Sequence, residues 1–159
     1  MSKNKRWNEI KKMLLQSGTF SKDGAKQLNP VTLAFIGDAV YALYVRERLV
    51  KTNGGKVADL QRASAKILSA KGQSEFLAEI EPLFTDEERE IYLRGRNAKK
   101  ATKSRNATPA EYNRSTGLEA VIGFLYVTGD IARAEVLLSA IDEERFHTIC
   151  QATGFKPSH

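Results

Sequence analysis

Residues 31–50 read VTLAFIGDAVYALYVRERLV, and this apolar stretch decides the fold class. Its apolar side chains recur on most sides of a helix instead of alternating, which is typical of a buried helix. Asn29-Pro30 is a good helix start, and Asn53-Gly54-Gly55 ends the stretch. Similar patterns predict further helices over 57–80 (interrupted near Gly72), from 85 through 93, from 108 through 126, over 131–141 and over 142–152. Since no alternating apolar run calls for a strand, the chain is predicted to be all-α.

The length and composition indicate one ordinary globular domain. The chain has 159 residues, of which 42% are hydrophobic and 28% are charged, enough to form a core without disulfides. It contains neither an apolar run of membrane-spanning length nor a signal-peptide pattern. Cys150 is its single cysteine, so a disulfide framework and a cysteine zinc site are excluded. We therefore expect a cytoplasmic protein without a membrane partner.

The positive charge is concentrated in one segment. The formal net charge is +6, and residues 94–105 carry six basic side chains with no acidic residue among them. The formal charges of all other residues therefore cancel. Such a patch is typical of a surface that binds a polyanion, although a solvated loop that aids solubility has the same composition. The six residues are Arg94, Arg96, Lys99, Lys100, Lys103 and Arg105.

Two carboxylates lie in apolar surroundings. Asp38 follows Leu-Ala-Phe-Ile-Gly, and Glu119 lies within Gly-Leu-Glu-Ala-Val-Ile-Gly. A buried carboxylate needs a cation or a metal ion beside it. The neighbouring Gly37 and Gly123 would let another backbone or a substrate come close to each.

Both carboxylates also have a purely structural interpretation. Asp38 could pair with Arg46, Arg48 or a lysine elsewhere in the fold. Glu119 could be the third residue of a capping box that begins at Thr116. Taken residue by residue, these interpretations are favoured, because ordinary ion pairs also perturb carboxylates.

Several sequence blocks resemble the ribonuclease III family. Residues 33–40 are similar to that family's signature helix, in which an apolar stretch ends in Gly-Asp and a small residue. Residues 115–126 are similar to its second catalytic helix, with a Glu-Ala-x-x-Gly core. The Mini-ribonuclease III branch matches most closely, through Asn29-Pro30, the Gly-Asp-Ala-Val-Tyr of 37–41, the Arg-Gly-Arg-Asn-Ala-Lys of 94–99 and the Tyr-x-Arg-Ser-Thr-Gly of 112–117. The resemblance runs from about residue 28 to 147.

This resemblance implies a function, a site and an assembly. Asp38 and Glu119 would be catalytic and would hold Mg²⁺ in an endoribonuclease that cleaves double-stranded RNA, leaving 5′-phosphate and 3′-hydroxyl ends. The implied substrate is the precursor of large-subunit (23S) ribosomal RNA, which connects the chain with ribosome biogenesis, and the implied assembly is a homodimer. Residues 28–150 would form the catalytic domain, between a basic extension with a first helix (1–27) and a tail (151–159). No double-stranded-RNA-binding domain is expected, so the basic segment 94–105 would contact the RNA.

The chain departs from full-length ribonuclease III at two positions. That enzyme carries further carboxylates where this chain has Ala34 and Thr116, a thinner pattern that the Mini branch shares. A site with fewer protein ligands suits magnesium that keeps more of its water, as one ion or as a pair. Two rival interpretations remain: a non-catalytic RNA-binding domain with the same fold, and a helical protein-interaction module.

Overall fold

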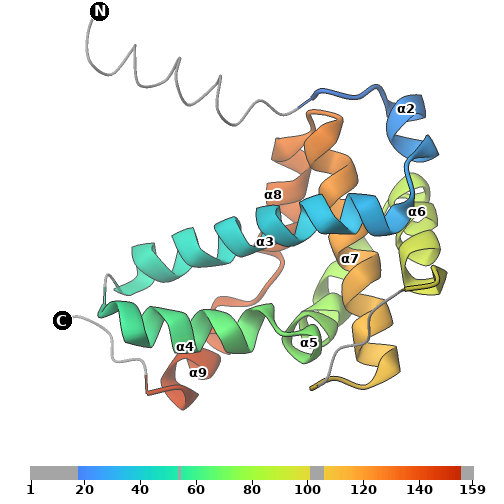
Figure 1. Ribbon diagram of the computed structural model, residues 1–159. Coiled ribbons are helices and arrows are strands. Elements are labelled where there is room, and N and C mark those ends of the chain that lie inside the picture. Colours follow the sequence, from blue (N-terminus) through green and yellow to red (C-terminus); the bar gives the residue numbers. More distant parts are fainter. Residues whose placement is uncertain (1–17, 54, 101–105, 155–159) are drawn as a thin grey trace, which may run out of the picture.

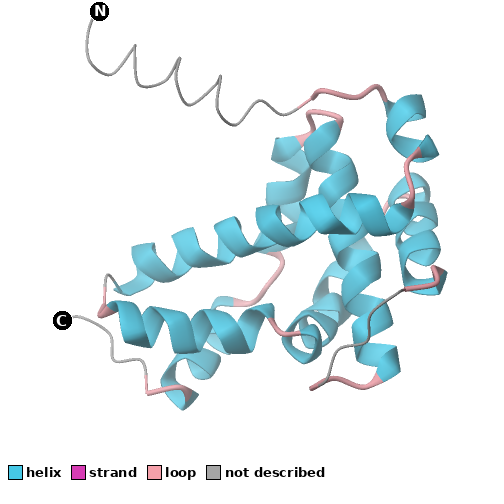
Figure 2. Ribbon diagram, in the orientation of Figure 1, coloured by secondary structure: helices cyan, strands magenta, loops and turns pink. Residues whose placement is uncertain are grey.

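The computed structural model describes residues 18–53, 55–100 and 106–154, and the described residues form helices and connecting loops without a strand (Figures 1 and 2). The predicted all-α fold is confirmed, and of the expected first segment 1–27 the description covers the part that contains α2. None of the described helices is long and apolar enough to cross a membrane. In chain order the elements are α2 (Lys22–Gln27), α3 (Pro30–Asn53), α4 (Val57–Leu68), α5 (Ala70–Ile80), the short 3₁₀ helix η1 (Glu81–Leu83), α6 (Asp86–Asn97), α7 (Pro109–Val127), α8 (Ile131–Ser139) and α9 (Glu143–Ala152).

Helix α7 is the centre of the fold. Most of its residues from Ser115 to Val127 are buried, and α3, α5, α6 and α8 all pack against it. Figure 1 shows α7 passing behind α3, with α5 and α6 beside it. A helix that is apolar on all sides is stable only when neighbours cover it on all sides, so the apolar sequence of α7 determines its central position.

Helix α3 is buried on one side and exposed on the other. Tyr41 and Val45 are fully buried, whereas Phe35 is 81% exposed and Leu43 is 55% exposed. The apolar sequence of α3 thus extends over more sides of the helix than the described residues cover. The reason is that α7 and α4 cover α3 from two directions, and no other described helix covers its remaining apolar face.

The predicted capping boxes begin α6 and α7. Thr85 accepts a hydrogen bond from the backbone N–H of Glu88, whose side chain accepts one from the N–H of Thr85. Thr108 and Glu111 repeat this reciprocal arrangement. These boxes satisfy N–H groups that a helix start otherwise leaves without partners.

The break in the predicted 57–80 helix lies at Ser69, not at Gly72. The Ser69 hydroxyl accepts from the N–H of Gly72 and so begins α5, while its own N–H still bonds to Ala65 at the end of α4. A Cβ atom on Gly72 would lie 2.4 Å from the carbonyl oxygen of Lys66. Gly72 therefore does not end a helix; it allows α5 to fold back tightly against the end of α4.

Candidate active site

Helices α3 and α7 cross in backbone contact at two glycines. A Cβ atom on Gly37 would lie 1.7 Å from the carbonyl oxygen of Glu119, and one on Gly123 would lie 1.9 Å from the carbonyl oxygen of Leu33. Any side chain at either position would force the helices apart. The close approach expected from these glycines is therefore confirmed, and it brings Asp38, the residue after Gly37, next to Glu119.

The two carboxylates interact and differ in exposure. Asp38 is exposed and Glu119 is partly buried, so the expected apolar setting is right for Glu119 and wrong for the Asp38 side chain. Burial raises the pKa of Glu119 to about 8; a hydrogen bond from Gln73 opposes this shift, and the nearby Asp38 carboxylate adds to it. Two carboxylates held together in this way attract a cation or a proton.

The structural interpretations of the two carboxylates lose their support. Asp38 forms no ion pair with a described residue, and Arg48 instead binds Glu143 and the carbonyl of Ile141. Glu119 lies in the middle of α7, ten residues after its first residue, so a capping box beginning at Thr116 is wrong.

Gln73 on α5 is a site residue that the sequence interpretation missed. Its side chain is 2% exposed. Its amide nitrogen donates to the Glu119 carboxylate (Nε2 to Oε1, 2.8 Å) and to the carbonyl oxygen of Leu68 (3.1 Å). Both N–H groups of the amide are thus used, and the second bond anchors the side chain to the end of α4. Gln73 fixes one oxygen of Glu119 in place.

A signal for Gln73 was present in the sequence. It precedes the buried Phe76, Leu77 and Ile80 by three, four and seven positions, so it lies on the inward face of α5. A polar residue on an apolar inward face needs a buried partner. Which partner it finds depends on how α5 packs against α7, and the pattern of one helix does not contain that information.

The positions that lack carboxylates do not supply another oxygen to the site. Ala34 is buried, and the Thr116 hydroxyl donates to the carbonyl oxygen of Tyr112. Among the described residues there is no group of three or more metal-ligating side chains. Two carboxylates, one exposed and one fixed by an amide, fit magnesium, which keeps several waters and needs few protein ligands.

The predicted RNA-binding residues divide into two groups. Arg94 donates to the carbonyl oxygens of Lys26 and Leu28 (2.9 and 3.3 Å), where it satisfies the end of α2. Lys100 donates to the carbonyls of Arg96 and Ala98 and to the side chain of Asn113, and burial lowers its pKa. These two cations stabilise the fold around the basic segment.

Arg96 and Lys99 have more freedom to meet a ligand. Lys99 is exposed and has no ion pair within the described part of the chain, and Arg96 contacts Asn97 and the ring of Tyr92. Lys103 and Arg105 lie outside the described residues. Of the predicted RNA-binding residues that the structure describes, Arg96 and Lys99 therefore have the N–H groups most available to a ligand.

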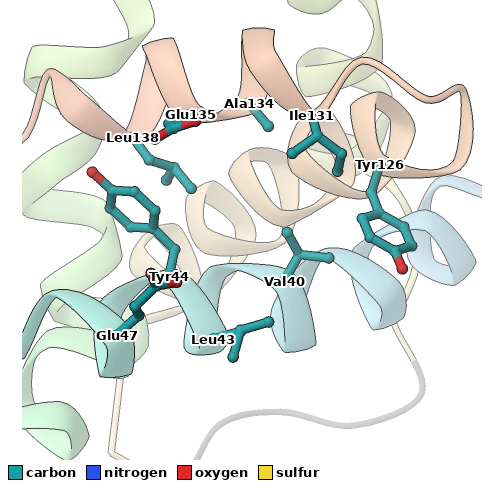
Figure 3. Close-up of a pocket in the computed structure, with 9 residues that line it drawn as sticks. All are labelled: Val40, Leu43, Tyr44, Glu47, Tyr126, Ile131, Ala134, Glu135 and Leu138. Carbon is teal, nitrogen blue, oxygen red and sulfur yellow. The ribbon is translucent and has the colours of Figure 1, made fainter. Parts of the chain in front are cut away.

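An apolar pocket adjoins the exposed face of α3 (Figure 3). It has a volume of about 380 Å³. Figure 3 shows Val40 and Leu43 of α3 facing Ile131 and Leu138 of α8 across it, with Tyr126 of α7 at one end. This pocket and the exposed Phe35 and Leu43 form a largely apolar surface, which is unusual for a domain that remains alone in water.

Comparisons with known proteins agree with this geometry. The family model described as the ribonuclease III domain matches residues 31–130. A protein of Staphylococcus aureus named Mini-ribonuclease 3 is 48% identical over 73% of this chain and 88% of its own length. A protein of Symbiobacterium thermophilum with the same name is 43% identical over 72% of this chain and 89% of its own length.

A solved structure is similar as well. The crystal structure of a protein from Fusobacterium nucleatum superposes with a TM-score of 0.65 at 28% sequence identity. The match covers 71% of this chain and 90% of that one. The residues that match the family model, 31–130, contain both Asp38 and Glu119.

Proposed function

The chain belongs to the ribonuclease III family and is an endoribonuclease, and we propose that it cleaves double-stranded RNA with magnesium held by Asp38 and Glu119. The observation that carries the site assignment is the crossing of α3 and α7 at Gly37 and Gly123, which puts the two carboxylates together.

Each residue has a distinct part in the proposed reaction. Asp38 presents an exposed carboxylate toward the solvent and the substrate. Glu119 supplies the second carboxylate, and Gln73 restrains its Oε1 atom. When bound, magnesium supplies an activated water and positive charge at the attacked phosphate. No side chain has to act as nucleophile, and the expected products carry 5′-phosphate and 3′-hydroxyl ends.

We further propose that the active form is a homodimer. The exposed apolar surface of α3 supports this assembly, and a second copy is the proposed occupant of that surface. A twofold dimer gives two equivalent sites, and the two strands of an RNA duplex are also related by a local dyad. Each subunit would then cut one strand.

The natural substrate we propose is precursor 23S ribosomal RNA, trimmed at its ends in the cytoplasm. Both relatives described above are named Mini-ribonuclease 3, and the resemblance to that branch suggests this substrate. The basic segment 94–105 would contact the RNA backbone. A-form RNA is recognised mainly through its shape, phosphates and 2′-hydroxyls, which suits arginine and lysine side chains.

A direct test uses end-labelled duplex RNA with the full chain, with and without magnesium. Cleavage is expected only with magnesium, and Asp38→Asn or Glu119→Gln should reduce it by orders of magnitude because each removes a charge that holds the ion. Asp23→Asn and Glu90→Gln make the same changes at exposed positions and should cleave like the parent. Cleavage by Asp38→Asn at the parent rate would refute the site. RNA binding without cleavage by the parent would favour the non-catalytic rival.

A further inference from the structure

A polar hollow, separate from the apolar pocket beside α3, lies between α6 and α7. It has a volume of about 290 Å³ and is lined by Arg96, Asn97, Ala110, Asn113 and Arg114. Two of these side chains carry a guanidinium group, and none of the five is acidic. Apart from Arg96, none of them belongs to the predicted site.

The two asparagine amides are oriented by cations. The Arg96 side chain donates from Nε to Oδ1 of Asn97 (3.2 Å), and the Lys100 ammonium donates from Nζ to Oδ1 of Asn113 (3.0 Å). Because arginine and lysine only donate hydrogen bonds, each contacted atom must be the amide oxygen. The acceptor of each amide is therefore engaged, and its N–H donors form no hydrogen bond with a described residue. The hollow is lined by hydrogen-bond donors.

The positive charge in the hollow is not neutralised by a described carboxylate. Arg114 is exposed and forms no hydrogen bond or ion pair with a described residue. Arg96 contacts Asn97 and lies over the ring of Tyr92, with its guanidinium carbon 5.8 Å from the ring centre. Glu111, the carboxylate nearest to Arg114 in sequence, is engaged in the capping box with Thr108.

Close packing of α6 on α7 brings the two arginines to one hollow. A Cβ atom on Gly95 would lie 3.0 Å from the Cα of Gly117, and one on Gly117 would lie 2.6 Å from the ring of Tyr92. Arg96 directly follows the first glycine, and Arg114 lies one turn before the second. The same small residues that let the helices touch thus bring both arginines to the lining of one hollow.

We propose that this hollow binds a backbone phosphate of the RNA substrate, a step that rests on the proposed function. Guanidinium groups bind phosphate through paired N–H donors, and the asparagine N–H groups add uncharged donors. Arg114 precedes Glu119 by five positions on α7, which is about 7.5 Å along the helix axis. Arg114 and Glu119 thus lie on the same helix, within the span of a short stretch of RNA backbone, although on different sides of the helix axis.

The test measures binding of the full chain to duplex RNA in EDTA, so that cleavage does not interfere, over 50 to 200 mM salt. Arg96→Gln and Arg114→Gln should each weaken binding several-fold and reduce the slope of log affinity against log salt by about one. The affinity lost over that salt range should then be about 3.5-fold smaller than for the parent. Arg89→Gln removes the same charge from α6 at an exposed position paired with Glu81, and should keep the parent slope.

Three comparisons decide the result. If both arginines hold one phosphate, the double variant loses about one unit of slope, because the two changes are not additive; a loss of two units would refute a single shared phosphate. Slopes equal to that of Arg89→Gln in both single variants would refute the site while leaving the proposed function intact. A parent that neither binds nor cuts duplex RNA would refute the proposed function, and the phosphate site with it.

Discussion

Replacing Gln73 tests whether the Glu119 carboxylate must be fixed in place to hold magnesium. Gln73→Leu keeps a side chain of similar size and removes the hydrogen bond of 2.8 Å from Nε2 to Oε1 of Glu119. A hydrogen bond to a charged group contributes about 1.5–3 kcal/mol. If that contribution favours the metal-binding arrangement, the variant should need roughly tenfold to hundredfold more magnesium for half-maximal cleavage.

Two measurements separate this effect from a general loss of structure. The first is cleavage rate against magnesium concentration, in which the half-maximal concentration should rise while the rate at saturation is largely recovered. The second is the magnesium-induced rise in melting temperature, which needs no RNA and should shrink in parallel. Gln61→Leu makes the same change at an exposed position of α4 and should behave like the parent. If Gln73→Leu responds to magnesium as the parent does, Gln73 does not position Glu119.

Three other changes test the carboxylate pair and the assembly. Because the pKa of Glu119 is raised to about 8, magnesium must displace its proton at lower pH. Metal affinity measured by calorimetry should therefore fall by up to about tenfold per pH unit below 8. Without metal, the raised pKa means that the contribution of Glu119 to the stability of the fold decreases as pH rises from 4.5 to 8. A pH-independent affinity would contradict this assignment. Phe35→Glu should convert a dimer to monomers in sedimentation, because Phe35 is 81% exposed on the apolar face. Val57→Glu, also at an exposed apolar position, should not. A parent that sediments as a 17.7 kDa monomer yet cuts both strands would rule out the paired-site mechanism. Gly37→Ala should lose most activity and lower the melting temperature, since its Cβ would overlap the backbone of α7; normal melting and cleavage would show that the helices can separate without harm.

The helical fold could be predicted from sequence because its signals are local. The capping boxes at Thr85 and Thr108 start their helices where the pattern indicates. The glycines beside Asp38 and Glu119 indicated close approach, and α3 and α7 do meet at these glycines. Each of these features can be recognised within a few consecutive residues.

What could not be predicted depends on contacts between distant segments. The periodicity of α3 does not say which of its faces a neighbour covers, so the exposure of the Asp38 side chain was not predicted. The count of basic residues in 94–105 does not distinguish Arg94, which caps α2, from Arg96, which faces a hollow. Gln73 was missed for the same reason, because its partner Glu119 lies on another helix.

The crossing of α3 and α7 also determines when during folding the proposed active site is assembled. Asp38 and Glu119 are far apart in sequence and come together only when the two helices dock at Gly37 and Gly123. Contacts between distant segments carry a loop-closure cost that local helix formation does not. A newly synthesised chain with its helices formed but not docked therefore has no paired carboxylates. If the proposed site is correct, magnesium bound by the docked pair would stabilise only the complete fold, and a partly folded chain would not cut RNA.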